Sequence, residues 1–214
     1  MVSGNRTVAV FPLGTVLFPG MPLPLHIFEP RYRLMMEEVL QGLPLAVFSI
    51  EDGQEALGRL ARPAAVGTLV TLDQVERMQD GRMNLLVTGT QRLRWDRAVS
   101  EDPFWKADLD PWPDEDEGQA TVEKADLALT LRRELSDYLS LLQIKTQVEL
   151  PEEADLLCHL CIQNSGLPLP DRQAFLEIPT LADRMRKTIN LMRRKNLLIR
   201  SSPGPGLQQG ESLN

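Results

Sequence analysis

The sequence predicts an α+β fold, with a β-rich N-terminal half followed by a helical bundle. Three observations support this. Residues 11–32 are apolar but carry five prolines, which excludes a regular helix or a central strand. An Asp-Gly pair at Asp80-Gly81 lies between long β-branched runs, which is a strong hairpin signal. Beyond the segment PWPDEDEG, residues 111–118, the apolar spacing becomes helical and stays so.

Bulk composition limits the class of protein. The chain has 214 residues, a net charge of −7, a pI near 5.0 and 43% hydrophobic residues, as in an ordinary globular protein. The excess of acid repels polyphosphates and disfavours non-specific nucleic-acid binding. Two cysteines provide no disulfide framework, and no apolar run reaches the length of a membrane span or a signal peptide. We therefore expect a cytoplasmic protein without a membrane segment.

The N-terminal half begins with two short strands and a helix. We expect strands at residues 7–11 and 23–27, on either side of a proline-rich loop, and a third at residues 45–50. Pro30 suits the first turn of a helix, where its missing N–H is not needed. The apolar stripe of that helix ends before Gly42, and its members are Tyr32, Met35, Met36, Val39 and Leu40.

The hairpin supplies the longest predicted strands. Residues 66–75 lead to Asp80-Gly81 and residues 85–88 lead away from it, while residues 104–109 are typical of one more strand. Gly67 and Gly89 lie within these strands and are candidates for bulges that coil a sheet toward closure. The simplest assembly is a mixed, barrel-like sheet with one embedded helix.

The C-terminal half is separated from the first by acid. Residues 114–117 are all Asp or Glu and predict a solvated linker over residues 114–119. It divides a β-rich subdomain, residues 1–113, from a helical subdomain, residues 120–200, and residues 201–214 are Gly/Pro/Ser/Gln-rich and predicted to be disordered. Asp171 is expected to cap a short helix, and Thr180 with Asp183 predicts a capping box for the last one.

Few residues are candidates for a catalytic, redox or metal-binding role. Cys158 and Cys161 fall on the apolar stripe of a helix, so core packing is favoured over metal or redox roles. His26 alternates with apolar neighbours on a short strand and is interpreted as a hydrogen-bonded structural histidine. No serine lies in a nucleophile motif and no G-x-x-x-x-G-K-[ST] phosphate loop occurs. We predict no catalytic residue, no metal and no cofactor.

Residues 17–23, here called the apolar loop, are the best binding candidate. A loop cannot satisfy its backbone polar groups deep in a core, so we expect part of the cluster to reach the surface. The alternative, which the sequence slightly favours, is that it folds inward and plugs the open end of the barrel. The candidate ligand-binding residues from this loop and the following Phe-Glu-Pro-Arg-Tyr element are Leu17, Phe18, Pro19, Met21, Leu23, Phe28 and Tyr32.

Charged residues offer two further hypotheses. Glu29 is expected to pair with Arg92 or Arg31 and to hold the apolar loop to the barrel, a structural role rather than ligand contact. The last helix is basic through Arg193, Arg194 and Lys195, with no acid after Asp183. That run predicts a solvated helix face, with RNA binding as the alternative.

Three segments resemble a known family. They are the Phe-Pro-Leu, Phe-Pro-Gly and Phe-Glu-Pro-Arg-Tyr elements within residues 11–32, the Val-Gly-Thr to Gly-x-x-Arg hairpin at residues 66–92, and residues 171–194. In order and spacing they are similar to the N-terminal substrate-binding domain of the Lon protease family, over about residues 7–200. The resemblance implies a PUA-like pseudo-barrel followed by a helical bundle.

The resemblance also implies a function. A stand-alone domain of this kind, without the ATPase and protease domains of Lon, is expected to bind unfolded or apolar polypeptide segments in protein quality control and to catalyse nothing. The alternatives are an RNA-binding PUA-like protein and an adaptor whose partner is a separate protease or ATPase. The sequence predicts neither a membrane partner nor an oligomeric state.

Overall fold

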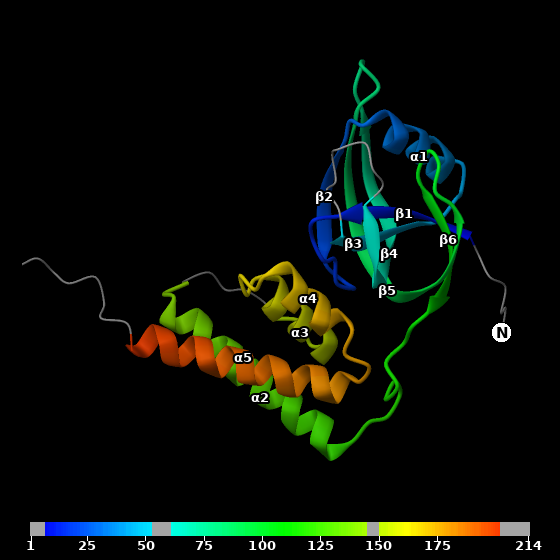
Figure 1. Ribbon diagram of the computed structural model, residues 1–214. Helices are drawn as coiled ribbons and strands as arrows, with labels where there is room; N and C mark the ends of the chain where they lie inside the picture. Colours follow the sequence, from blue (N-terminus) through cyan, green and yellow to red (C-terminus); the bar gives the residue numbers. More distant parts are fainter. Residues whose placement is uncertain (1–6, 53–60, 145–149, 202–214) are drawn as a thin grey trace, which may run out of the picture.

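The computed structural model describes residues 7–52, 61–144 and 150–201, and it confirms an α+β fold (Figure 1). The described residues form six strands and five helices. The β-rich half comprises β1 (Thr7–Leu13), β2 (Pro22–Ile27), α1 (Pro30–Leu40), β3 (Leu45–Asp52), β4 (Arg62–Arg77), β5 (Met83–Ser100) and β6 (Trp105–Pro111). The helical half comprises α2 (Val122–Leu141), α3 (Ala154–Gln163), α4 (Leu169–Leu176) and α5 (Leu181–Ser201).

The strands pair in the order β2-β5-β4-β3-β1-β6, and β6 also pairs with β5. Five strands therefore form a closed circuit, while β2 is attached to β5 outside it. Pro22 and Pro24 have no backbone N–H to give to a second neighbour, so β2 suits this edge position. The pair β1–β3 is parallel and the other pairs are antiparallel.

The predicted hairpin is present, with Gly81 at a φ of 82° in its turn. Both glycines predicted to mark bulges lie beside register shifts. The shift between β4 and β5 skips Thr90, next to Gly89, and the shift between β3 and β4 follows the pair of Phe48 with Gly67. Gly67 also makes room for a ring, because a Cβ there would lie 2.4 Å from Phe48.

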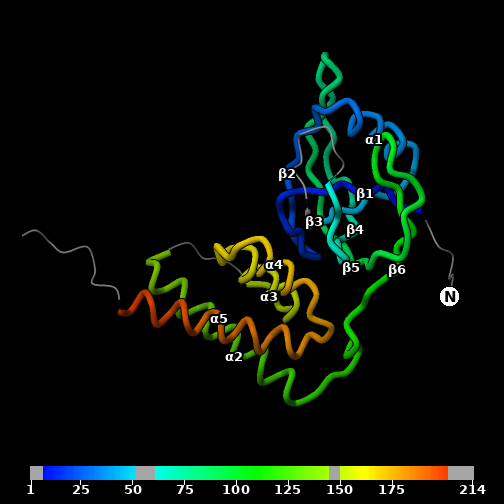
Figure 2. Tube along the Cα trace, viewed as in Figure 1, coloured from blue at the N-terminus to red at the C-terminus, as the bar shows by residue number. Residues whose placement is uncertain are grey.

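In the helical half, α2 and α5 lie side by side, and α3 and α4 lie between this pair and the barrel (Figures 1 and 2). Thr180 accepts a hydrogen bond from the N–H of Asp183 (3.2 Å), as the predicted capping box requires. The prediction that Asp171 caps α4 is wrong. The cap position is Pro168, and Asp171 lies in the first turn, where its charge complements the helix dipole.

Buried apolar side chains form two clusters. The smaller lies inside the ring and draws on all five of its strands, as expected for a filled barrel; its members include Val10, Leu69, Phe48, Leu93 and Leu109. The larger joins α1, the apolar loop and the four C-terminal helices, so one core crosses from the barrel to the helices. Ser201, the first residue of the predicted disordered tail, ends α5, and residues 202–214 lie outside the described residues.

None of the described helices has the combination of length and apolar content that crossing a bilayer requires.

Candidate functional site

The apolar loop is buried, so the expectation of an exposed apolar cluster is wrong for its largest side chains. Leu17 is 2% exposed, and Phe18 and Met21 are also buried. The physical reason is that the loop backbone finds partners on the barrel. The N–H of Gly20 donates to the carbonyl of Gly89 (2.8 Å), and the N–H of Gly89 donates to the carbonyl of Met21 (3.1 Å). With its polar groups satisfied, the loop can enter the core.

Helix α3 covers the other side of the loop. The ring of His159 lies 5.2 Å from that of Phe18, and its Nδ1 lies 2.9 Å from the carbonyl oxygen of Pro19. Gly20 meets Leu156 so closely that a Cβ would lie 2.1 Å from it. The loop therefore folds inward, as the alternative interpretation held, and fills the junction between the barrel and the helices.

The Cys-His-Leu-Cys element of α3 is part of this core. Burial raises the pKa of both Cys158 and Cys161 to about 12, so neither is a thiolate at neutral pH. Burial, together with the charge of Arg184, lowers the pKa of His159 to about 3, so the ring is neutral. The described residues contain no group of three or more His, Cys, Asp or Glu that could hold a metal. The three side chains pack the junction.

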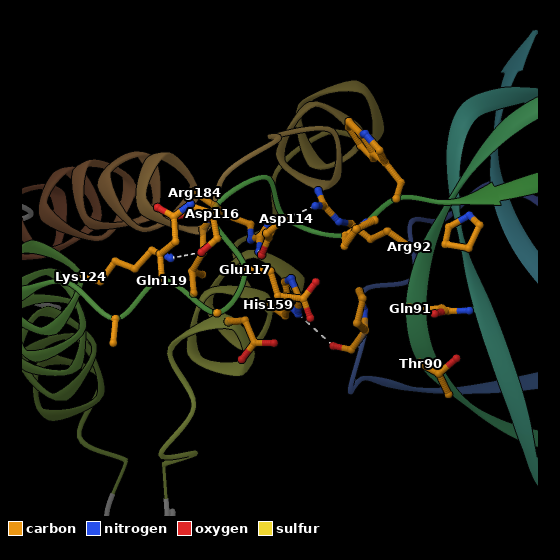
Figure 3. Close-up of a pocket in the computed structure, with 18 residues that line it drawn as sticks. Thr90, Gln91, Arg92, Asp114, Asp116, Glu117, Gln119, Lys124, His159 and Arg184 are labelled. Atoms are coloured by element: carbon orange, nitrogen blue, oxygen red, sulfur yellow. Dashed lines mark hydrogen bonds and ion pairs between the residues drawn. The ribbon is translucent and has the colours of Figure 1, made fainter. Parts of the chain in front are cut away.

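The acidic segment, defined here as residues 112–118, is not the solvated linker that its composition predicted. Asp114 is half-buried and pairs with two arginines from opposite halves of the molecule, Arg92 of β5 (2.5 Å) and Arg184 of α5 (2.6 Å) (Figure 3). Arg92 is 6% exposed and Arg184 is 2% exposed. One carboxylate thus neutralises two buried cations.

Arg92 also binds the helical half directly. Its guanidinium donates to the carbonyls of Leu176 and Ile178, at 2.8 Å and 2.7 Å, and lies over the ring of Trp112. The predicted pair of Glu29 with Arg92 is therefore wrong, because α4 and the acidic segment occupy that guanidinium. Glu29 pairs with Arg31 instead (2.7 Å), which confirms the other half of the prediction.

Asp116, in the same segment, caps the start of α5 and pairs with α2. Its carboxylate accepts the N–H groups of Leu181 (2.8 Å) and Ala182 (3.2 Å) at the start of α5 and pairs with Lys124 of α2 (2.9 Å). A carboxylate at a helix N-terminus satisfies free donors and complements the dipole. The side chains of Glu115 and Glu117 are exposed.

A cleft of about 580 Å³ lies beside these ion pairs, between the acidic segment, β5 and α3 (Figure 3). Thr90 and Gln91 line one side and His159 lines another. Two of its carboxylates are committed to structure: Asp114 is shared between two arginines, and Asp116 bonds Lys124 and a helix terminus. The carboxylates of Glu117 and Asp155 also line the cleft.

Two of the exposed large apolar side chains, Phe28 and Leu34, lie at the start of α1, and Figure 1 shows this helix at the end of the barrel away from α2–α5. Phe28 is 56% exposed and stacks on His26, with ring centroids 5.9 Å apart. A small depression of about 120 Å³ adjoins it on one side. On the other, a groove of about 440 Å³ runs between α1 and the β4–β5 turn. We call this region the Phe28 surface; its apolar members are Phe28, Pro30, Leu34, Met78 and Met83.

The predicted site residues are thus divided. Phe28 is accessible, Pro19 and Leu23 are partly so, and Tyr32 is buried beneath the surface, against Phe11. His26 is exposed, and its Nδ1 lies 2.7 Å from Asn84, as a hydrogen-bonded structural histidine requires. Leu34, which is 54% exposed, escaped the sequence analysis. It lies one position from the buried stripe of α1, and only its exposure distinguishes it.

Three arginines of the basic run of α5 are engaged with α2. Arg186 pairs with Glu123, Arg193 with Glu134 (2.9 Å) and Arg200 with Asp137 (3.5 Å). These pairs run along the contact between the two helices. The three arginines are exposed, as the prediction of a solvated helix face requires, and their pairing with carboxylates removes part of the charge on which RNA binding depended.

Comparison with known proteins agrees with this architecture. A family model described as the ATP-dependent protease La (LON) substrate-binding domain matches residues 7–194. Lon protease 1 of Bdellovibrio bacteriovorus is 26% identical over 97% of this chain, and Lon protease of Azorhizobium caulinodans is 27% identical over 87%. The chain spans about a quarter of the length of these relatives, 27% and 22% respectively.

Two solved structures share the fold. The Lon N-terminal domain protein from Xanthomonas campestris superposes with a TM-score of 0.63 at 24% identity, covering 86% of this chain and 97% of that one. The N-terminal domain of Mycobacterium avium complex Lon protease gives 0.69 at 19% identity, covering 88% and 98%. The matched region is the substrate-binding domain, and these 214 residues contain neither an ATPase nor a protease domain. The chain belongs to the Lon substrate-binding domain family.

Proposed function

We propose that this chain binds unfolded or apolar polypeptide segments, without chemical change to them, at the Phe28 surface. The observation that carries the proposal is the exposure of Phe28 and Leu34 beside two depressions, in a domain whose family is defined by substrate binding. Exposed large apolar side chains around a groove are typical of an interaction surface.

The composition of the surface suits ligands of variable sequence. Met78 lies in the groove and is partly exposed, and a flexible thioether side chain adapts to differently shaped apolar partners, whereas Met83 is buried in the lining. Arg33 lies along the same groove and can meet carbonyl oxygens of an extended chain, whereas Arg77 is paired there with Glu37 (3.1 Å). A disordered ligand loses conformational entropy on binding, so we expect micromolar affinity for a single segment.

We propose that this binding precedes proteolysis by another protein. The relatives named Lon protease are about four times as long as this chain, which aligns with only a quarter of them. We infer that the segments held at the Phe28 surface are meant for a protease or ATPase partner. Binding itself needs no such partner and can be tested on the isolated chain.

The test compares two double variants in binding to a fluorescein-labelled, permanently unfolded protein, followed by fluorescence anisotropy. Phe28→Ser with Leu34→Ser removes apolar area from the Phe28 surface. We expect about tenfold weaker binding, because part of two large side chains no longer becomes buried. Leu34 and Phe28 are exposed, so the fold should persist.

The matched control replaces Val122 and Leu129 of α2 by serine, two exposed apolar residues far from the barrel. It should bind the unfolded protein as the wild type does. Absence of binding by the wild type would contradict the proposed function. Equal losses in both double variants would contradict the assignment to the Phe28 surface.

A further inference from the structure

A second groove lies on the helical half, between α4 and α5. Its volume is about 690 Å³, and buried Ile178 and Leu191 form its floor. Leu167, Phe175 and Leu198 form apolar walls. The groove shares no residue with the Phe28 surface and lies on the other half of the molecule.

The rim of this groove is basic in an acidic protein. Lys187, Arg194 and Lys195 line it against one carboxylate, Asp171, whereas the whole chain carries a net charge of −7. Lys195 lies over the ring of Tyr138, at 5.7 Å. Lys187 and Arg194 are exposed, and neither forms an ion pair with a carboxylate in the part of the chain that the structure describes.

Lys187 and Arg194 differ from the three arginines of α5 that face α2. Arg186, Arg193 and Arg200 face α2 and are paired with its carboxylates. Lys187 and Arg194 line the groove on the α4 side and have no counterpart there apart from Asp171. Pairing with α2 therefore explains three of the seven cations of α5 and does not account for Lys187 and Arg194, of which Lys187 has only the charge of Asp183 near it on the same helix.

The spacing along α5 sets a pattern. Lys187, Leu191, Arg194 and Leu198 all line the groove and follow one another at intervals of four, three and four residues, so they form one stripe. Seven residues of helix separate the two cations by about 10 Å along the axis. Leu191 lies between them on the floor. The stripe thus alternates charge and apolar surface.

We propose that the groove between α4 and α5 binds an acidic amphipathic polypeptide helix. Its leucine-type side chains contact Ile178 and Leu191, and two of its carboxylates, about 10 Å apart, pair with Lys187 and Arg194. Helix-in-groove recognition uses anchors at such intervals, and complementary charge fixes the register and excludes basic segments. The site is separate from the Phe28 surface and gives the protein a second, charge-selective mode of binding.

The apolar floor favours a polypeptide over a nucleic acid. RNA binding without apolar contact depends on phosphate-neutralising cations and on stacking with aromatic side chains. The groove has two unpaired cations and one aromatic residue, Phe175, which is half-buried. Leucine-type side chains match the remaining lining.

The probe for the test is a fluorescein-labelled synthetic helical peptide with two glutamates seven residues apart and leucines between them. Three companions are used: the same residues in scrambled order, the peptide with lysine for each glutamate, and the peptide with serine for each leucine. Anisotropy is measured with the full chain at about 0.05 M and about 0.5 M sodium chloride. We expect binding of the designed peptide alone, weakened at high salt.

Two double variants with the same change in net charge locate the site. Lys187→Glu with Arg194→Glu should weaken binding of the designed peptide about tenfold or more, because each exposed pair is replaced by repulsion. Arg62→Glu with Arg94→Glu changes two exposed arginines of the barrel and should leave it unchanged. Ala174→Trp, at an exposed position of α4 in the groove, should block binding without altering charge.

The outcomes separate this inference from the proposed function. Loss of peptide binding in the groove variants, with retention in Phe28→Ser/Leu34→Ser, supports a second site whether or not the unfolded protein binds the Phe28 surface. Loss only in Phe28→Ser/Leu34→Ser overturns the groove. Equal binding of the scrambled or serine-substituted peptide, or tighter binding of a uridine oligonucleotide, overturns the amphipathic helix as its occupant. No binding of the designed peptide at low salt overturns the inference outright.

Discussion

Two segments that lie largely outside the strands and helices join the barrel to the helical half, and they do so by opposite means. The apolar loop, residues 17–23, inserts Leu17, Phe18 and Met21 into a core shared with α3. The acidic segment, residues 112–118, places Asp114 between Arg92 and Arg184 and Asp116 at the start of α5. The apolar loop holds the two halves together by burying apolar side chains away from water, and the acidic segment holds them together by ion pairs.

The difference decides how each junction should fail. Apolar burial is spread over many contacts, so truncating one side chain removes that side chain's share and leaves a cavity. Removal of one partner of a buried ion pair costs more stability, because the remaining partners stay charged and desolvated. The acidic segment should therefore be the more sensitive of the two, although its composition is that of a solvated linker.

The largest expected effect is that of Asp114→Ala. It leaves two buried guanidiniums without their shared carboxylate, and we expect a loss of about 4 kcal/mol in the free energy of unfolding. Urea denaturation followed by circular dichroism measures it. Glu115→Ala, one residue away and exposed, should change stability by less than about 0.5 kcal/mol. Similar values for the two variants would show that the acidic segment is a linker after all.

A smaller loss is expected in the apolar loop. Leu17→Ala removes a buried leucine side chain and should cost about 3 kcal/mol, the sum of lost transfer energy and a cavity. Leu34→Ala, a half-exposed leucine on α1, is the matched control and should cost less than about 0.5 kcal/mol. A Leu17→Ala variant as stable as Leu34→Ala would mean that the loop is exposed in solution, as its sequence first suggested.

Periodicity predicted most of the fold. The stripe of α1, the hairpin at Asp80-Gly81 and the start of α5 at Thr180 all depend on residues within a few positions of each other. All were placed correctly except for Leu40, which was assigned to the stripe and is exposed. Closure of the ring was anticipated only in outline. The pairing of β5 with β6 that completes it depends on contacts between strands that local patterns do not encode.

The site was less predictable because its partners are distant in sequence. Asp114 lies 22 residues from Arg92 and 70 from Arg184, and no local pattern distinguishes it from exposed Glu115. The burial of Leu17 likewise depends on Gly89, which lets the loop approach β5 so closely that a Cβ there would lie 2.5 Å from the Phe18 carbonyl. The sequence shows no alternation that would mark a buried face, because Trp112 and Pro113 precede four consecutive acids.

The smallest predicted effect lies where the two junctions meet, at His159. Its pKa is about 3 in the folded protein, lowered by burial and by the charges of Arg184 and Arg92, against about 6.5 in the unfolded chain. Between these values the unfolded chain binds more protons, so stability falls as the pH falls below about 6.5. We expect this residue to account for a loss of about 1.4 kcal/mol between about pH 7.5 and about pH 5.5.

Urea denaturation of the wild type and His159→Gln at both pH values isolates the contribution of His159 to the pH dependence of stability. Titration of other groups contributes to both proteins and cancels in the difference, whereas the share of His159 is absent from the variant. His26→Gln removes the other, exposed histidine and should keep the pH dependence of the wild type. If His159→Gln kept it as well, the imidazole would have to gain water or a carboxylate on protonation, and the junction between the apolar loop and the ion pairs would be open to solvent rather than sealed.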